Sequence, residues 1–166
     1  MKKGIIFILL NIALGLSSFA QNSIRLFHID RNKNSAIVCY DLNLKDGVID
    51  KNNPIAIYWS DSNKPTEKLN DLSSIQKKMA FGINVSSVSD NKVSFTMKAY
   101  NKKTITVTYN ATTKTASPLT ILDGKQARLQ RLFVSASPPM YTSVDYVEFY
   151  GQSVQTKENL YEKITN

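Results

Sequence analysis

The chain has 166 residues, of which 21 are lysine or arginine and 13 are aspartate or glutamate, giving a formal net charge of +8 at pH 7. The basic residues are scattered among acidic and amide neighbours, which argues against a nucleic-acid-binding protein, where a basic stripe interleaved with aromatic residues is usual. The single cysteine excludes an internal disulfide. One histidine and one cysteine are also too few for a zinc site, which takes three or four protein ligands.

Residues 1–20 have the pattern of a signal peptide. Lys2 and Lys3 form a basic start, an apolar run follows, and Ser18 and Ala20 are the small residues preferred before a cleavage point. We therefore expect export to the periplasm or the extracellular space, with residues 21–166 as a single β-rich domain of net charge +6. No later apolar run approaches the ~20 residues of a membrane-spanning helix, so no transmembrane segment is expected after cleavage.

The exported part alternates between apolar and polar residues over many short stretches, the period of half-buried strands. Turn residues separate these stretches, and Asp46-Gly47 and Asp123-Gly124 are strong hairpin dipeptides. The strands predicted in this way cover residues 24–29, 36–44, 55–60, 83–88, 93–100, 104–110, 118–122, 126–136 and 144–150, with a short closing strand at 160–164.

One stretch has helical spacing instead. Leu69, Leu72, Ile75 and Met79 recur at intervals of three and four, and the sequence from Ser73 to Gln76 fits a capping box. One short helix is predicted near residues 73–81. Loops too short for parallel crossovers predict an antiparallel meander of about eight or nine strands, forming a barrel or a strongly curved sheet.

The stretch from Leu26 to Leu44 contains the residues whose side-chain chemistry is most unusual for this chain. His28 and Cys39 are each unique in the chain, and Asp41 is a carboxylate within an apolar strand. A Cys39/His28 thiolate pair is one reading, but a thiol within a strand is more often inert packing. Asp41 must find a partner if it is buried. We expect Arg128 or Lys98 there, forming either an ion pair or an acid/base couple.

Several runs together resemble one family. They are Phe27-His28-Ile29, Val38-Cys39-Tyr40-Asp41, Tyr58-Trp59, Ala80-Phe81-Gly82, Asp123-Gly124 with Arg128, and Asp145-Tyr146-Val147 with Tyr150-Gly151. In these runs the chain resembles the domain of unknown function 4833 family, exported proteins common in the Bacteroidetes. The resemblance supports export and a single domain, and it implies no activity.

Two hypotheses remain. In the first, the domain is a non-catalytic binding or structural module of the bacterial envelope, a monomer without cofactor or metal whose partner is a small ligand or an envelope protein. Its candidate binding residues are His28, Arg31, Asn34, Asp41, Tyr58, Trp59 and Arg128. In the alternative, a hydrolase-like enzyme uses a polar cluster in the barrel interior, with Asp41 or His28 as the base and Arg128 holding an anionic substrate. The alternative requires these three side chains to converge on one solvent-reachable pocket.

Overall fold

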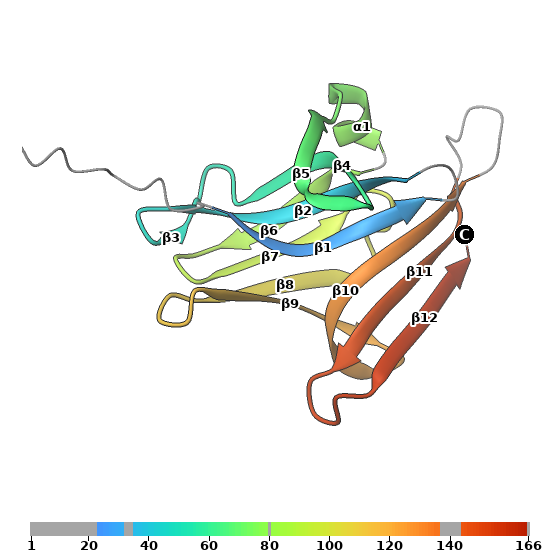
Figure 1. The fold of residues 1–166 in the computed structure, drawn as a ribbon. Coiled ribbons are helices and arrows are strands. Elements are labelled where there is room, and N and C mark those ends of the chain that lie inside the picture. Colours follow the sequence, from blue (N-terminus) through green and yellow to red (C-terminus); the bar gives the residue numbers. More distant parts are fainter. Residues whose placement is uncertain (1–22, 32–34, 80, 137–143, 166) are drawn as a thin grey trace, which may run out of the picture.

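The computed structural model describes residues 23–31, 35–79, 81–136 and 144–165. They form twelve strands and one helix (Figure 1). In chain order these are β1 (Ser23–Arg31), β2 (Ala36–Lys45), β3 (Val48–Ile49), β4 (Ile55–Asp61), β5 (Lys64–Asp71), α1 (Ser74–Met79), β6 (Ile83–Val88), β7 (Lys92–Met97), β8 (Thr104–Asn110), β9 (Thr115–Leu122), β10 (Lys125–Ala136), β11 (Val144–Ser153) and β12 (Asn159–Thr165).

Nine strands form a strongly curled half-barrel in the order β5-β4-β2-β1-β10-β9-β8-β7-β6, and β11 and β12 extend it from β10 (Figure 1). The mainly β fold with one short helix is therefore confirmed. Two details differ from the expectation. The described residues form more strands than the eight or nine predicted, and β1 pairs with β10 in parallel rather than antiparallel orientation.

The two halves of the sheet meet at β10, which pairs with a different strand on each part of its length. The first part of β10 pairs with β9, at Arg128 opposite Leu119, whereas its second part pairs with β1, at Arg131 opposite His28. Between these two partners the β10–β11 register shifts, from Leu129 to Arg131. A bulge bends a strand and increases its twist, so the two halves of the sheet diverge here and curl around a common core.

Alternation along the strands fills that core. Val38, Tyr40 and Leu42 point into this core from one face of β2, and all three are fully buried. Phe27 stacks on Tyr40 with ring centroids 4.7 Å apart, and the Tyr40 hydroxyl donates to the Phe81 carbonyl oxygen at 2.7 Å. The one polar atom of this large core side chain is thus satisfied where it is buried.

The turn chemistry read from the sequence is confirmed at both hairpin dipeptides. Asp46 and Gly47 have φ values of +53° and +81°, and Asp123 and Gly124 have values of +46° and +72°. Two successive positive φ values define the type I′ turn, whose twist matches that of the flanking strands. These turns fix the β2–β3 and β9–β10 hairpins.

The capping box is also confirmed, because Gln76 N–H donates to Ser73 Oγ at 3.2 Å and Ser73 N–H donates to Gln76 Oε1 at 2.9 Å. The helical period does not extend as far back as predicted. Leu69 lies in β5, where every residue is exposed. A strand with no buried face shows no alternation, so the pattern gave no signal for β5.

Candidate functional site

Asp41 is the buried carboxylate of β2, and its partner is Arg25 of β1. Arg25 Nε donates to Asp41 Oδ1 at 2.5 Å, and the Tyr58 hydroxyl donates to Asp41 Oδ2 at 2.7 Å. Arg25 Nη2 also donates to the Tyr58 hydroxyl at 3.0 Å and to the Pro65 carbonyl oxygen at 2.7 Å. Both carboxylate oxygens are therefore engaged. The cluster links β1, β2, β4 and β5 on the face opposite the core.

The expected partners of Asp41, Arg128 and Lys98, were wrong, and a bulge explains the error. Phe27 lies opposite Tyr40, so regular pairing would bring Leu26 opposite Asp41. The β1–β2 register shifts between Arg25 and Phe27, which brings Arg25 opposite Asp41 instead. Regular alternation along β1 would not bring Arg25 opposite Asp41, because the bulge inserts one residue that the period of two does not include.

Cys39 lies beside this cluster and is fully buried. Burial, the largest cause, raises the pKa of its thiol to about 11, although the charge of Arg25 acts in the opposite direction. His28 is its cross-strand neighbour on β1. Activation as a nucleophile would need a lowered thiol pKa, so this environment opposes a Cys39/His28 thiolate pair.

His28 lies near Asp30 rather than Asp41, with Nε2 3.3 Å from Asp30 Oδ1. Burial lowers the pKa of His28, and the charge of Asp30 partly offsets that effect. Asp30 in turn accepts a hydrogen bond from Arg131 Nη1 at 2.9 Å. His28 therefore lies beside the Asp30–Arg131 ion pair, which joins β1 and β10.

The other sequence candidates are dispersed. Trp59 packs edge-on against Phe81 on the core side of β4, with ring centroids 5.5 Å apart. Arg128 is exposed on β10 and lines a separate hollow next to Gln152. Arg31 ends β1, and its side chain, like Asn34, lies outside the described residues. The three side chains that the hydrolase hypothesis needs are not gathered in one pocket.

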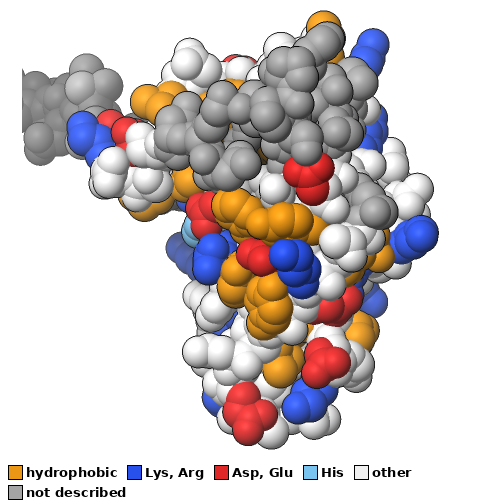
Figure 2. Space-filling model, turned by 90° about the vertical axis from the view of Figure 1, so that its right-hand side faces the viewer, with side chains coloured by type: hydrophobic (Ala, Val, Ile, Leu, Met, Phe, Trp, Pro, Cys, Tyr) orange, Lys and Arg blue, Asp and Glu red, His pale blue; other side chains and the backbone are white. Residues whose placement is uncertain are grey.

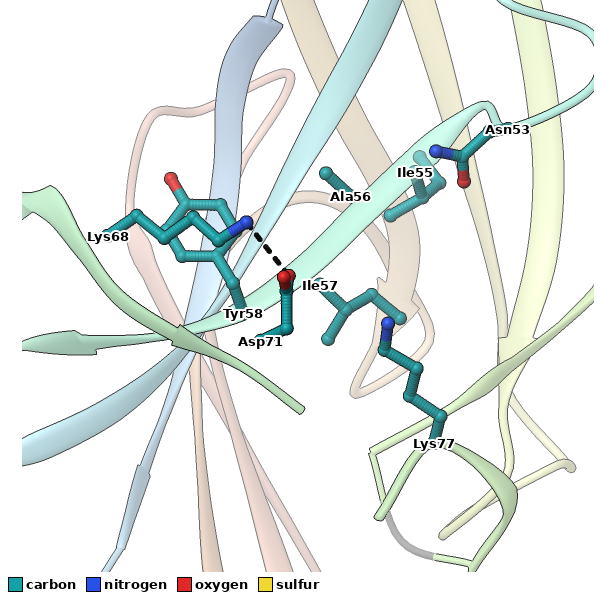
Figure 3. A pocket seen from close by; sticks show the side chains of 8 residues that line it. All are labelled: Asn53, Ile55, Ala56, Ile57, Tyr58, Lys68, Asp71 and Lys77. Atoms are coloured by element: carbon teal, nitrogen blue, oxygen red, sulfur yellow. Dashed lines mark ion pairs between the residues drawn. The ribbon is translucent and has the colours of Figure 1, made fainter. Parts of the chain in front are cut away.

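Tyr58 instead lines a hollow of about 280 Å³ between β4, β5 and α1 (Figure 3). Apolar side chains of β4 and charged side chains of β5 and α1 surround it. The lining residues are Asn53, Ile55, Ala56, Ile57, Tyr58, Lys68, Asp71 and Lys77. This volume is close to the lower end of the roughly 300–1,000 Å³ of small-ligand sites.

The charges of this hollow, which we call the β4–β5 pocket, are unequal. Lys68 Nζ lies 2.8 Å from Asp71 Oδ1, and this hydrogen bond, with the charges of Lys68 and Lys77, lowers the pKa of the Asp71 carboxyl. Lys77 has no ion-pair partner among the residues that the structure describes. Two cations and one anion leave one positive charge in excess.

Tyr58 connects the pocket to the Arg25–Asp41 pair. Burial and the hydrogen bond to Asp41 raise the pKa of its hydroxyl, so the hydroxyl stays protonated at neutral pH. Of the pocket residues, the sequence singled out Tyr58 alone. Lys68, Asp71 and Lys77 were missed because an exposed edge strand and a short helix give no pattern that would bring them together.

Within the described ranges there is no group of three or more histidine, cysteine, aspartate or glutamate side chains suited to a metal ion. The same part of the chain contains no helix long and apolar enough to cross a membrane.

Comparison with known proteins gives one match. The family model described as "Domain of unknown function (DUF4833)" matches residues 27–163, from β1 to β12. No curated protein and no solved structure matches the chain. The family model covers well over half of the 166 residues, and the chain therefore belongs to the DUF4833 family.

Proposed function

We propose that this domain is a non-catalytic binding module of the bacterial envelope, and that its β4–β5 pocket holds a small ligand with one carboxylate and a short apolar part. The observation that carries the proposal is the pairing of an unneutralised Lys77 with an apolar wall. Figure 3 shows Lys77 directed into the hollow beside Ile57, with Asp71 and Lys68 on the other side.

Each part of the pocket has a role in this proposal. A ligand carboxylate would accept hydrogen bonds from Lys77, while Asp71 holds Lys68 in position. Ala56 and Ile57 would contact the apolar part. The Tyr58 ring closes the hollow, and its hydroxyl is fixed by Arg25 and Asp41, so the wall is formed before a ligand arrives.

The arrangement gives no support to hydrolysis. Asp41 is held by Arg25 and Tyr58, its side chain is 7% exposed and it does not line the β4–β5 pocket, whereas a general base must lie within reach of the proton it removes. His28 and Arg128 lie away from the β4–β5 pocket, which neither of them lines. The envelope location rests on the signal-peptide pattern of residues 1–20, which lie outside the described residues.

The test is a titration of the purified chain with sodium hexanoate, followed by the backbone amide shifts of Ala56, Tyr58 and Lys77 in NMR. We expect these signals to move with a saturable dependence on hexanoate, and hexanamide to bind at least tenfold more weakly. Equal responses to the two compounds would overturn the proposal, because the excess charge would then have no role.

Lys77 and Lys78 form a matched pair on α1, since both are exposed and only Lys77 lines the pocket. Lys77→Ala is expected to weaken hexanoate binding at least tenfold, and Lys78→Ala to change it less than twofold. Equal losses in the two variants would mean that the effect is general positive charge and would contradict the proposed site.

A further inference from the structure

Among the described strands longer than two residues, three have a single neighbouring strand and therefore one open edge along their length, and these are β5, β6 and β12. An exposed edge presents unpaired backbone N–H and C=O groups, to which another strand can add. Natural proteins protect such edges with charges and bulges. The three edges differ in this respect.

Two of the edges are protected. The β4–β5 pairing has two register shifts, and charged pairs run along β5, with Lys64 next to Glu67 and Lys68 next to Asp71. The β6–β7 register shifts between Val85 and Ser87. Neither β5 nor β6 offers a straight row of backbone groups.

The β12 edge is regular, since seven consecutive pairs join it to β11 without a shift. Its charged side chains turn back toward their own sheet. Glu162 Oε2 lies 3.0 Å from Lys103 Nζ and accepts the Asp123 N–H at 3.0 Å. Lys163 Nζ lies 3.6 Å from the ring centroid of Tyr146 and 3.9 Å from Glu148 Oε1. Neither charged side chain therefore protects the open edge of β12 against pairing with another strand.

The backbone direction follows from the β11–β12 turn, where Ser153 N–H donates to the Glu158 carbonyl oxygen at 2.8 Å. In an antiparallel ladder, hydrogen-bonded and non-hydrogen-bonded pairs alternate. The peptide groups of Leu160, Glu162 and Ile164 therefore face β11. Those of Tyr161 and Lys163 face the open edge.

We propose that β12 pairs with β12 of a second copy of this chain, antiparallel, with the two-fold axis at Glu162. The inference is independent of the ligand proposed for the β4–β5 pocket, and it replaces the monomer expected from the sequence. A two-fold axis requires a self-complementary surface. The residues of β12 meet this requirement in one register.

In that register Tyr161 lies opposite Lys163 of the second copy, which is a cation–aromatic pair. The peptide groups of these two residues, which face the open edge, would hydrogen-bond to each other. On the core side, Leu160 lies opposite Ile164 of the second copy. Glu162 lies opposite Glu162 of the second copy, and each of the two carboxylates stays paired with Lys103 of its own chain. An axis at Lys163 would place two lysines directly opposite each other. An axis at Tyr161 would place the apolar Leu160 opposite the charged Glu162 of the second copy.

The face beside this edge adds a second argument. Figure 2 looks at the side of the molecule formed by β10, β11 and β12, where hydrophobic side chains surround a few charged ones. On these strands the rings of Tyr150 of β11 and Tyr161 of β12 have centroids 5.3 Å apart, and Tyr161 is about half exposed, at 49%. Pairing through β12 would continue this aromatic face across two copies.

Sedimentation equilibrium of the purified chain between 5 and ~300 µM tests the proposal. We expect a reversible dimer with a dissociation constant in the micromolar range. Lys163→Pro removes an edge N–H without touching the β11 ladder, so it should raise that constant at least tenfold with unchanged circular dichroism. A chain that stays monomeric throughout would overturn the proposal.

Disulfide trapping tests the register without depending on proline. In the Glu162→Cys variant, the two substituted residues of the dimer lie opposite each other at the proposed axis. They should form a crosslinked dimer under mild oxidation. In the Thr165→Cys variant, each substituted residue lies three positions from the axis, on opposite sides of it. The two are therefore roughly 20 Å apart at ~3.4 Å per residue and should not crosslink. Equal crosslinking of the two variants, or none in Glu162→Cys, would contradict this register.

Discussion

Arg25 Nε lies 2.5 Å from Asp41 Oδ1, and this ion pair joins the first two strands of the domain beneath the β4–β5 hairpin. The Asp41 side chain is 7% exposed and that of Arg25 30% exposed, so water screens the pair only partly. Tyr58 and the Pro65 carbonyl oxygen complete the hydrogen bonds. The pair therefore positions the wall of the β4–β5 pocket and also stabilises the fold.

Removing the carboxylate should be costly. Asp41→Ala leaves the Arg25 guanidinium partly buried without its partner, and we expect the free energy of unfolding to fall by about 2–4 kcal/mol, less than for a fully buried pair because Arg25 reaches solvent. Urea denaturation monitored by circular dichroism measures it.

Two controls separate the parts of this cluster. Tyr58→Phe removes one hydrogen bond and should cost about 1 kcal/mol. Lys51→Ala breaks a pair with Asp90 whose side chains are 59% and 66% exposed, and it should cost less than about 0.5 kcal/mol. A cost for Asp41→Ala no larger than that for Lys51→Ala would contradict the structural role of the pair.

Cys39 should resist alkylation in the native protein, because its thiol is fully buried and its pKa is about 11. Incubation with iodoacetamide at pH 7.5 followed by mass spectrometry should show little adduct, whereas the same reaction in 8 M urea should go to completion. Rapid labelling of the native chain would mean that the thiol is accessible and activated.

His28 should make the domain less stable in mild acid. Its folded-state pKa lies below the ordinary value of about 6.5, so the unfolded chain takes up a proton before the folded one does. Its contribution to stability is complete above pH ~6.5 and is lost as the pH falls from there through the folded-state pKa.

The check is the urea midpoint of wild type and His28→Gln at several pH values from 7.5 downward. The wild type should lose more stability than the variant below pH ~6.5, and the two slopes should agree above it. Parallel curves over the whole range would show that another group controls the acid sensitivity.

Gly151 should tolerate no side chain, because a Cβ there would lie 2.7 Å from the Arg128 carbonyl oxygen, next to the β10 bulge. Gly151→Ala should cost about 1–3 kcal/mol, the usual range for overpacking. Gln152→Ala, at the half-buried neighbour, should cost much less. Thermal melts compare the two, and similar melting temperatures would contradict the close approach at the bulge.

The sequence predicted those parts of the fold that depend on local chemistry. Asp46-Gly47 and Asp123-Gly124 form their turns because few other dipeptides accept two positive φ values, and Ser73 with Gln76 caps α1 through contacts three residues apart.

Long-range relationships could not be predicted in this way. The Arg25–Asp41 pair depends on a bulge, and the parallel pairing of β1 with β10 joins residues about a hundred positions apart. The β4–β5 pocket depends on β5, whose exposed side chains carry no alternation. Uniqueness in the chain made His28 and Cys39 conspicuous, but it says nothing of which side chains meet in space.

The proposal that the domain binds rather than hydrolyses is tested most directly by locating a bound carboxylate. A crystal structure of the chain soaked with 4-bromobenzoate would do this, because the bromine identifies the molecule by anomalous scattering. We predict the carboxylate within hydrogen-bond distance of Lys77 Nζ and the ring against Ala56 and Ile57. Bromobenzoate bound only elsewhere on the chain, with the β4–β5 pocket empty, would contradict the account.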